Sequence, residues 1–258
     1  MTTIISNGHY LIADHRRSGN ENSSYRNLIG YHKDIRTNTS KLTRKKTIYV
    51  HKDIAEKFYF LEKPLPVGKK DHGSITHMVF CGKVEGTTAI LRFIEHYMHD
   101  KHITDKSLTA IIPYLKMLSF TGSVGLFGIT DTFYTEELKF VRNNNNLTTT
   151  HTSYSPGTMA IAGSGAGKVK ALSIPIQKLH PREVFLIAQY LDPYTSPTYG
   201  VYGNQEKQYA PFVFEPEDKR SGEAKALILK YLQRNHNNTY KALVTAGDEG
   251  YDSETDFV

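Results

Sequence analysis

The chain begins MTTIISNGHYLIADHR over residues 1–16. Apolar, strand-forming pairs at residues 4–5 and 11–12 flank Asn7-Gly8, a dipeptide typical of tight turns with positive φ. The stretch therefore predicts an antiparallel hairpin over residues 2–14.

The start of this hairpin also suggests a chemistry. A small second residue such as Thr2 favours removal of Met1, which would leave a hydroxyl and a free α-amine on the same residue. Such a terminus is a nucleophile that carries its own base. The other interpretation is that Thr2 only opens an ordinary strand, and these residues alone do not decide between the two.

Length and charge narrow the classes of protein. The chain has 258 residues, of which 39% are hydrophobic, and we expect one large domain over residues 2–245. Its 32 basic and 26 acidic residues give a net charge of +6. The basic residues gather only at 41–46, where an apolar strand at 48–50 explains them as a solvated strand entry. We therefore expect no nucleic-acid partner.

Cysteine content and hydropathy bear on the compartment. Cys81 is the only cysteine, so an intrachain disulfide is excluded and a reducing compartment fits best. The sequence contains neither a continuous apolar stretch of the length of a membrane span nor an evident signal peptide. These features predict a soluble, cytoplasmic protein with no membrane partner.

The periodicity of apolar residues changes along the chain. It predicts strands at 28–31, 46–50, 75–80, 124–129 and 138–141, and helices near 90–97, at 181–191 and at 223–233. Segment 108–118 fits either a helix or a strand pair, and the prolines and lysines at 64–70 indicate a turn or insertion. Groups of strands alternating with helices predict an α+β layered domain rather than a parallel α/β sheet.

Two motifs are set aside. Residues 162–168 resemble a phosphate-binding loop but lack glycine at Ala162 and serine or threonine at Val169. The triplet at 163–165 is then either a plain turn or a close approach of backbone that presents the Ser164 hydroxyl. The histidines at 96, 99 and 102 fit a solvated helix end better than a zinc site. We expect no cofactor and no metal.

Five fragments, in this order, resemble the proteasome β-subunit family and its HslV-like bacterial relative, which are N-terminal-nucleophile (Ntn) hydrolases. The fragments are the opening threonines and hairpin with Ala13-Asp14-His15-Arg16, then Thr39-Ser40-Lys41-Leu42, Phe80-Cys81-Gly82, Ala160-Ile161-Ala162-Gly163-Ser164-Gly165, and Asp192-Pro193-Tyr194-Thr195. The resemblance covers about residues 2–200, with poorly matched insertions near 15–38 and 51–74.

The resemblance implies a four-layer αββα sandwich, in which two antiparallel sheets are flanked by helices. It implies that Thr2 attacks a peptide carbonyl, that Asp14 holds a lysine, and that the Gly82 amide stabilises the oxyanion. The lysine matches Lys41, with Lys45 and Lys46 as competitors. The residues that would orient the α-amine are Ser164, Asp192 and Thr195.

The function implied is that of an N-terminal threonine peptidase, which cleaves peptides or unfolded proteins and assembles into a homo-oligomeric ring. An ATPase unfoldase is an implied partner, and the acidic tail at 246–258 is either disordered or a contact for such a partner. Two alternatives stay open. One is an inactive structural or assembly subunit that keeps Met1, and the other is an amidase that acts on a small molecule.

Overall fold

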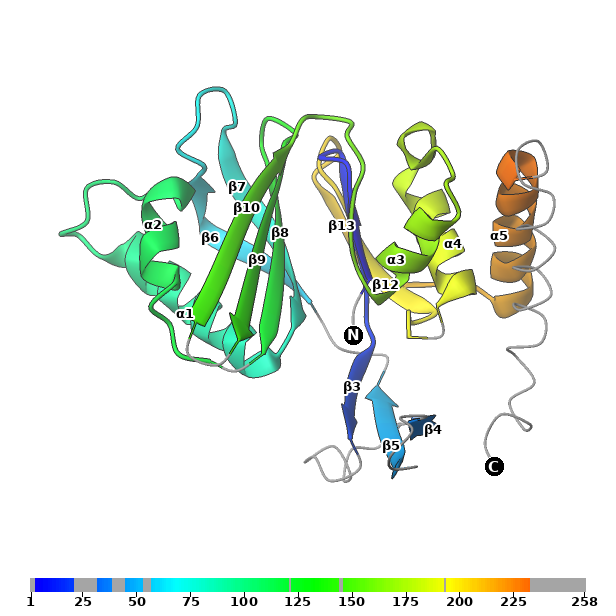
Figure 1. The fold of residues 1–258 in the computed structure, drawn as a ribbon. Helices are drawn as coiled ribbons and strands as arrows, with labels where there is room; N and C mark the ends of the chain where they lie inside the picture. Colours follow the sequence, from blue (N-terminus) through cyan, green and yellow to red (C-terminus); the bar gives the residue numbers. More distant parts are fainter. Residues whose placement is uncertain are drawn as a thin grey trace.

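A computed structural model describes residues 3–20, 32–38, 45–52, 57–120, 122–143, 146–192 and 194–232. Two five-stranded antiparallel sheets face each other, and helices cover the outer face of each sheet, as Figure 1 shows. The order of layers is helix, sheet, sheet, helix. The predicted fold class, an α+β four-layer sandwich, is confirmed.

The first sheet has the order β11-β1-β2-β12-β13. Its strands are β1 (Thr3–Ser6), β2 (Tyr10–Asp14), β11 (Ala160–Gly163), β12 (Thr198–Gly203) and β13 (Gln208–Phe214). The hairpin β1–β2 is the one predicted, and Ile5 lies opposite Ile12 in its register. Strands β12 and β13 were not predicted.

The turn of this hairpin explains its Asn-Gly signal. Gly8 has φ +80°, and a Cβ there would lie 1.6 Å from the Phe133 carbonyl oxygen, so only glycine fits. The Asn7 side chain accepts hydrogen bonds from the amides of His9 and Tyr10. Asn204, directly after β12, connects this turn to the second sheet. Its Nδ2 donates hydrogen bonds to the Gly8 carbonyl at 3.0 Å and to the Thr130 carbonyl, in the second sheet, at 2.8 Å.

The second sheet has the order β10-β9-β8-β7-β6. Its strands are β6 (Phe58–Pro66), β7 (Ser74–Gly82), β8 (Ser123–Thr130), β9 (Thr135–Asn143) and β10 (Asn146–Tyr154). The strands expected at 75–80, 124–129 and 138–141 are present. Strand β6 replaces part of the expected turn, because its prolines, Pro64 and Pro66, lie on an edge strand that has a ladder on one side only.

A third, small sheet extends from the sandwich in Figure 1 and has the order β3-β5-β4. Its strands are β3 (Arg17–Asn20), β4 (His32–Asn38) and β5 (Lys45–Lys52). Strand β5 contains the segment 46–50 that was predicted as a strand. The short strand expected at 28–31 and the acidic tail at 246–258 lie outside the described residues.

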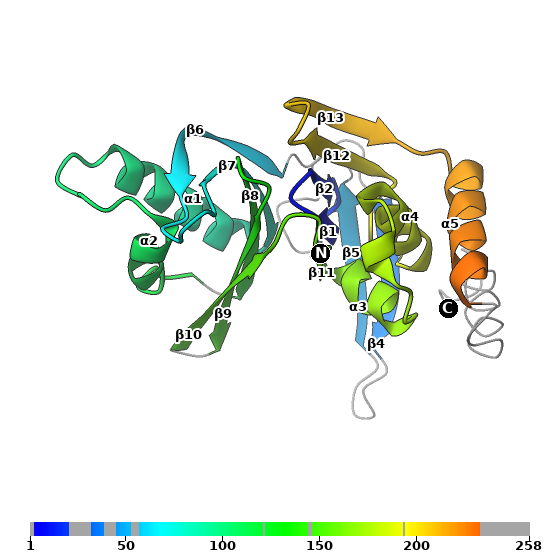
Figure 2. The same cartoon turned by 90° about the horizontal axis from the view of Figure 1, so that it is seen from above.

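Helices α1 (Val84–His99) and α2 (Leu108–Leu115) cover the second sheet, and α3 (Ser164–Ala171) and α4 (Pro181–Leu191) cover the first. Helix α5 (Glu217–Leu232) packs outside α4 (Figure 2). Helix α4 has the predicted bounds, with proline at its first position and a capping box made by His180 and Glu183. Helix α3 was not predicted. No helix among these is long and apolar enough to cross a membrane.

Strand β1 separates two apolar layers. Ile4 belongs to the cluster between the two sheets, with Val79 and Phe127, whereas Ile5 packs with residues of α3 and α4 such as Val184. Both isoleucines are fully buried. Alternation along a strand thus turns odd-numbered residues of β1 toward the helices and even-numbered residues toward the second sheet.

Candidate active site

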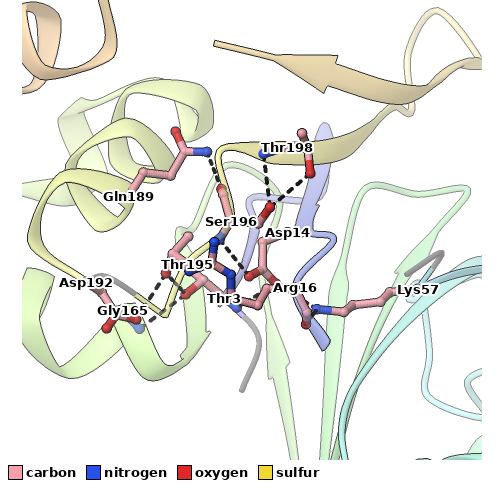
Figure 3. Close-up of polar contacts among 10 residues, drawn as sticks. All are labelled: Thr3, Asp14, Arg16, Lys57, Gly165, Gln189, Asp192, Thr195, Ser196 and Thr198. Carbon is pink, nitrogen blue, oxygen red and sulfur yellow. Dashed lines mark hydrogen bonds and ion pairs between the residues drawn. The ribbon is translucent and has the colours of Figure 1, made fainter. Parts of the chain in front are cut away.

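The carboxylate of Asp14, at the end of β2, is the centre of a buried polar cluster beside the start of β1. Its Oδ1 accepts hydrogen bonds from the Thr3 amide at 3.2 Å and from Lys57 Nζ at 2.8 Å. Its Oδ2 accepts one from the Ser196 amide at 3.1 Å. Asp14 is fully buried, and Figure 3 shows these donors converging on it. A buried carboxylate needs such charge and hydrogen-bond compensation.

The lysine that the structure places on this carboxylate is Lys57, immediately before β6. Its Nζ also donates to the Arg16 carbonyl at 2.7 Å, and its side chain is only 10% exposed. Lys41, the lysine predicted from the sequence, lies outside the described residues. Lys45 and Lys46 belong to β5, but the structure describes only their backbone. The role given to Lys41 therefore stays a prediction, while the expected ion pair with Asp14 is made by Lys57.

A second set of contacts surrounds the hydroxyl of Thr3, which is fully buried. Thr3 Oγ1 lies 2.6 Å from Thr195 Oγ1 and accepts a hydrogen bond from the Gly165 amide at 3.1 Å. Thr195 Oγ1 in turn donates to Asp192 Oδ2 at 3.1 Å. Three of the predicted site residues, Asp14, Asp192 and Thr195, are thus joined to one another through Thr3 (Figure 3).

The turn after α4 is built to hold this arrangement. Asp192 ends the helix, and its carboxylate also accepts a hydrogen bond from the Tyr194 amide, which is typical of an Asx turn. Gln189, one turn earlier, donates from Nε2 to the Ser196 carbonyl at 2.6 Å. The ends of α4 and of β2 are therefore connected through backbone groups of the same short turn.

Gly82 lies where expected, at the junction of β7 and α1. Its φ is +105°, and a Cβ would lie 2.1 Å from the Ser123 carbonyl oxygen, so glycine is required there. The pKa of the neighbouring Cys81 thiol depends on the groups around it. Burial raises this pKa, the charge of Lys57 opposes the rise, and the charge of Asp14 adds to it. Cys81, at the end of β7, thus lies within electrostatic range of the Lys57–Asp14 pair.

Ser164 is the first residue of α3, directly after Gly163, which pairs with Thr3 across β11 and β1. Its Oγ is buried and has no hydrogen-bond partner among the described residues. Most buried hydroxyls in proteins are hydrogen-bonded, so this group is available to a further donor or acceptor.

The sequence did not identify Thr3, Lys57 and the Ser196 amide as parts of the cluster. A signal existed for Thr3, because alternation along a strand puts Thr3 and Ile5 on the same face, which is the face toward the helices. Lys57 carried no comparable pattern, since it precedes an aromatic run in a region interpreted as an insertion. Thr2, the predicted nucleophile, lies outside the described residues. Within the described ranges, no three His, Cys, Asp or Glu side chains are placed to hold a metal ion.

No family model matches the chain, and no curated protein matches it. Solved structures of Anbu and of an Anbu (Gly-1) mutant, both from Hyphomicrobium sp. strain MC1, are similar, each at 9% sequence identity and a TM-score of 0.49. Each alignment covers 92% of this chain and 97% of the Anbu chain.

These comparisons correct the family assignment made from the five sequence fragments. That assignment, to the proteasome β subunits and HslV-like proteins, is wrong: no family model supports it, and the similar structures are those of Anbu. The fragments are short and are separated by poorly matched insertions, so their local similarity does not establish membership of that family.

Proposed function

We propose that this protein is an N-terminal threonine hydrolase, which cleaves amide bonds of peptides after removal of Met1. The observation that carries the proposal is the cluster around Asp14, where the Thr3 amide and the Lys57 ammonium share one carboxylate oxygen. Thr2 is joined to Thr3 by a single peptide bond. The Lys57 ammonium is therefore held on the same carboxylate oxygen as the amide that follows Thr2 in the chain.

The alternation of β1 supports the same assignment. Ile4 faces the second sheet and Ile5 the helices. One further residue of the same alternation would turn Thr2 toward the second sheet. Lys57 and Cys81 lie on that side, whereas Thr3 faces α3 and α4, where its hydroxyl already contacts Thr195 and Gly165. Thr2, rather than Thr3, is therefore the proposed nucleophile.

In the proposed reaction the Thr2 hydroxyl attacks the carbonyl carbon of the substrate, and its proton passes to the α-amine. The tetrahedral intermediate collapses, the C–N bond breaks, and the leaving amine takes that proton. Water then hydrolyses the ester on Thr2, which releases the acid product and restores the hydroxyl. The ordinary pKa of an α-amine, about 7.7–8.0, suits it to act as the base near neutral pH.

The other residues of the site have separate proposed roles. The Lys57 ammonium would lower the pKa of the neighbouring α-amine and stabilise the forming alkoxide, and Asp14 holds that ammonium in place. The Gly82 amide is the proposed donor to the oxyanion, a role whose loss in other enzymes costs about 3 kcal/mol. Ser164, with its buried and unsatisfied Oγ, is the proposed partner of the α-amine.

The test begins with intact mass spectrometry of the purified protein, which should find Thr2 as the first residue. Hydrolysis of a series of fluorogenic peptide amides, and of a reduced, unfolded protein, is then measured for the parent and for Thr2→Ala and Thr2→Ser. We expect Thr2→Ala to be inactive with an unchanged circular dichroism spectrum. Thr2→Ser should keep measurable activity, because it retains both the hydroxyl and the amine.

Three results would change the assignment. A Thr2→Ala variant as active as the parent would overturn the proposed nucleophile. A purified protein that retains Met1 and hydrolyses nothing would favour a structural or assembly role. Activity on small amides without any cleavage of unfolded protein would keep the mechanism but replace peptides by small molecules as the substrate class. Ring assembly, an unfoldase partner and the compartment stay predictions.

A further inference from the structure

The contacts of Thr3 form a hydrogen-bond chain whose direction is fixed by chemistry. Asp192 can only accept as a carboxylate, so the single proton of Thr195 Oγ1 points to Asp192 Oδ2. The proton in the 2.6 Å contact between the two hydroxyls must then come from Thr3. Thr3 Oγ1 in turn accepts from the Gly165 amide. The chain runs from Gly165 through Thr3 and Thr195 to Asp192.

We propose that Thr3 is a positioning residue of the active site, which orients Thr195 toward the α-amine of Thr2. This inference rests on the proposed function. The bond donated by Thr3 fixes the rotation of the Thr195 hydroxyl, so that its proton faces Asp192 and its remaining lone pair is free to accept from an ammonium. Thr3 is joined to Thr2 by one peptide bond, so the same residue also sets where that amine begins.

The contacts of Thr3 fix the positions of its backbone and its side chain. Its amide is held by Asp14 and its hydroxyl by Gly165 and Thr195, so both its backbone and its side chain are fixed. Helix α3 has no side-chain cap from its own N-cap residue, Gly163, and the Thr3 hydroxyl satisfies one of its free amides instead. A Cβ at Gly165 would lie 2.9 Å from Thr3 Oγ1, so that position is filled.

The experiment compares Thr3→Val, which keeps the shape of the side chain but cannot donate, with Thr3→Ser, which keeps the hydroxyl. The readouts are kcat and KM on a peptide amide that the parent cleaves, and the pH profile of kcat/KM. We expect Thr3→Val to lower kcat by about 10-fold or more with little change in KM, as for loss of an interaction used in the transition state. Thr3→Ser should stay within about threefold of the parent.

The pH profile separates positioning from mere stability. The acid limb of kcat/KM reports the pKa of the base in the free enzyme. Loss of an oriented acceptor disfavours the charged amine, so Thr3→Val should move the midpoint of that limb to lower pH by about half a unit or more. A residue that only stabilises the fold would lower the melting temperature and leave the midpoint where it is.

Ser6→Ala is the matched control, because Ser6 is a fully buried hydroxyl at the other end of β1 and lies 2.7 Å from Thr135 Oγ1. It should lower stability without moving the pH midpoint or kcat. An unchanged kcat and midpoint in folded Thr3→Val, in a protein that Thr2→Ala inactivates, would overturn this inference alone. If Thr2→Ala is fully active, the proposed function fails first and independently.

Discussion

Two buried carboxylates in this molecule are held by different kinds of partner. Asp14, in the first sheet, accepts from two backbone amides and from Lys57 Nζ. Glu136, in the second sheet, lies 2.8 Å from His72 and 2.6 Å from both His151 and Ser153. Both carboxylates are fully buried.

The two clusters also differ in where their partners originate. Those of Asp14 come from β1, from the residue before β6 and from the turn after α4, so three distant segments meet at the start of β1. Those of Glu136 come from the adjacent strand β10, where Ser153 lies directly opposite, and from the turn before β7. The first arrangement builds a site at one end of a strand, while the second fastens the edge of a sheet. We expect activity to depend on the first and only stability on the second.

The largest effect should come from Lys57→Met, which removes the ammonium held on Asp14. We expect kcat/KM for peptide amide hydrolysis to fall by about 10³-fold, as for loss of other charge-stabilising groups. Lys69→Met is the matched control, because Lys69 donates to Ser153 in the Glu136 cluster, and it should keep parental activity. Full activity of a folded Lys57→Met protein, together with an inactive Lys41→Met, would move the lysine role back to Lys41.

Crowding at Gly165 tests how tightly the first cluster is packed. In Gly165→Ala the new Cβ would lie 2.9 Å from both Ala188 Cβ and Thr3 Oγ1, and we expect the free energy of unfolding in urea to fall by about 2–3 kcal/mol. Gly167→Ala, in the same helix, meets nothing within 4 Å and should raise it by about 0.5–1 kcal/mol. Equal effects of the two substitutions would contradict this packing.

Glu136→Gln tests the second cluster. The amide keeps the size of the side chain but loses the charge that accepts from His72 and His151, so we expect a loss of about 1–2 kcal/mol in urea unfolding. Peptide hydrolysis by this variant should equal that of the parent at saturating substrate. A comparable loss of activity would show that the two carboxylates are not independent.

The smallest effect expected is on the pH dependence of the free energy of unfolding. Burial alone would raise the pKa of Glu136, but hydrogen bonds from His151, Ser153 and His72 lower it below its usual range overall. Stability from this group is therefore present above about pH 4.5 and lost as the pH falls through the lower folded value. As the pH falls below about 4.5, the parent should lose more unfolding free energy than Glu136→Gln, which has no carboxyl group to protonate there. Parallel curves for both proteins would contradict the lowered pKa.

Local patterns were sufficient to predict the elements whose signals lie within a few residues. The hairpin around Asn7-Gly8 and the helix that begins at Pro181 are examples, since turn chemistry and capping act locally. Helix α3 escaped prediction because its glycine-rich start reads as a turn and its cap comes from Thr3, far away in the chain. Strand β6 escaped because its prolines indicate a turn unless the strand is known to lie at an edge.

For the candidate site, the same limit applies. Asp14, Asp192 and Thr195 were predicted from short motifs, and the structure joins these three in one hydrogen-bond network. Lys57 was not identified, because its partner lies 43 residues away and only the three-dimensional fold brings them together. Motifs predict residues that lie near the end of a helix or strand. A charged residue such as Lys57, which reaches its partner from the other sheet, has no recognisable pattern in its neighbouring sequence.

Asn204 gives the strand β1 a fixed point at the end opposite Thr3. Its amide ties the hairpin turn to the second sheet, and the carbonyl of Asn7 in that turn also accepts from the Gly157 amide at 2.9 Å. The strand is thus anchored at its far end and cannot slide along its axis. Proteolytic maturation before Thr2 would change the chemistry of the terminus while leaving the strand register unaltered, so a precursor and its trimmed product should share one fold.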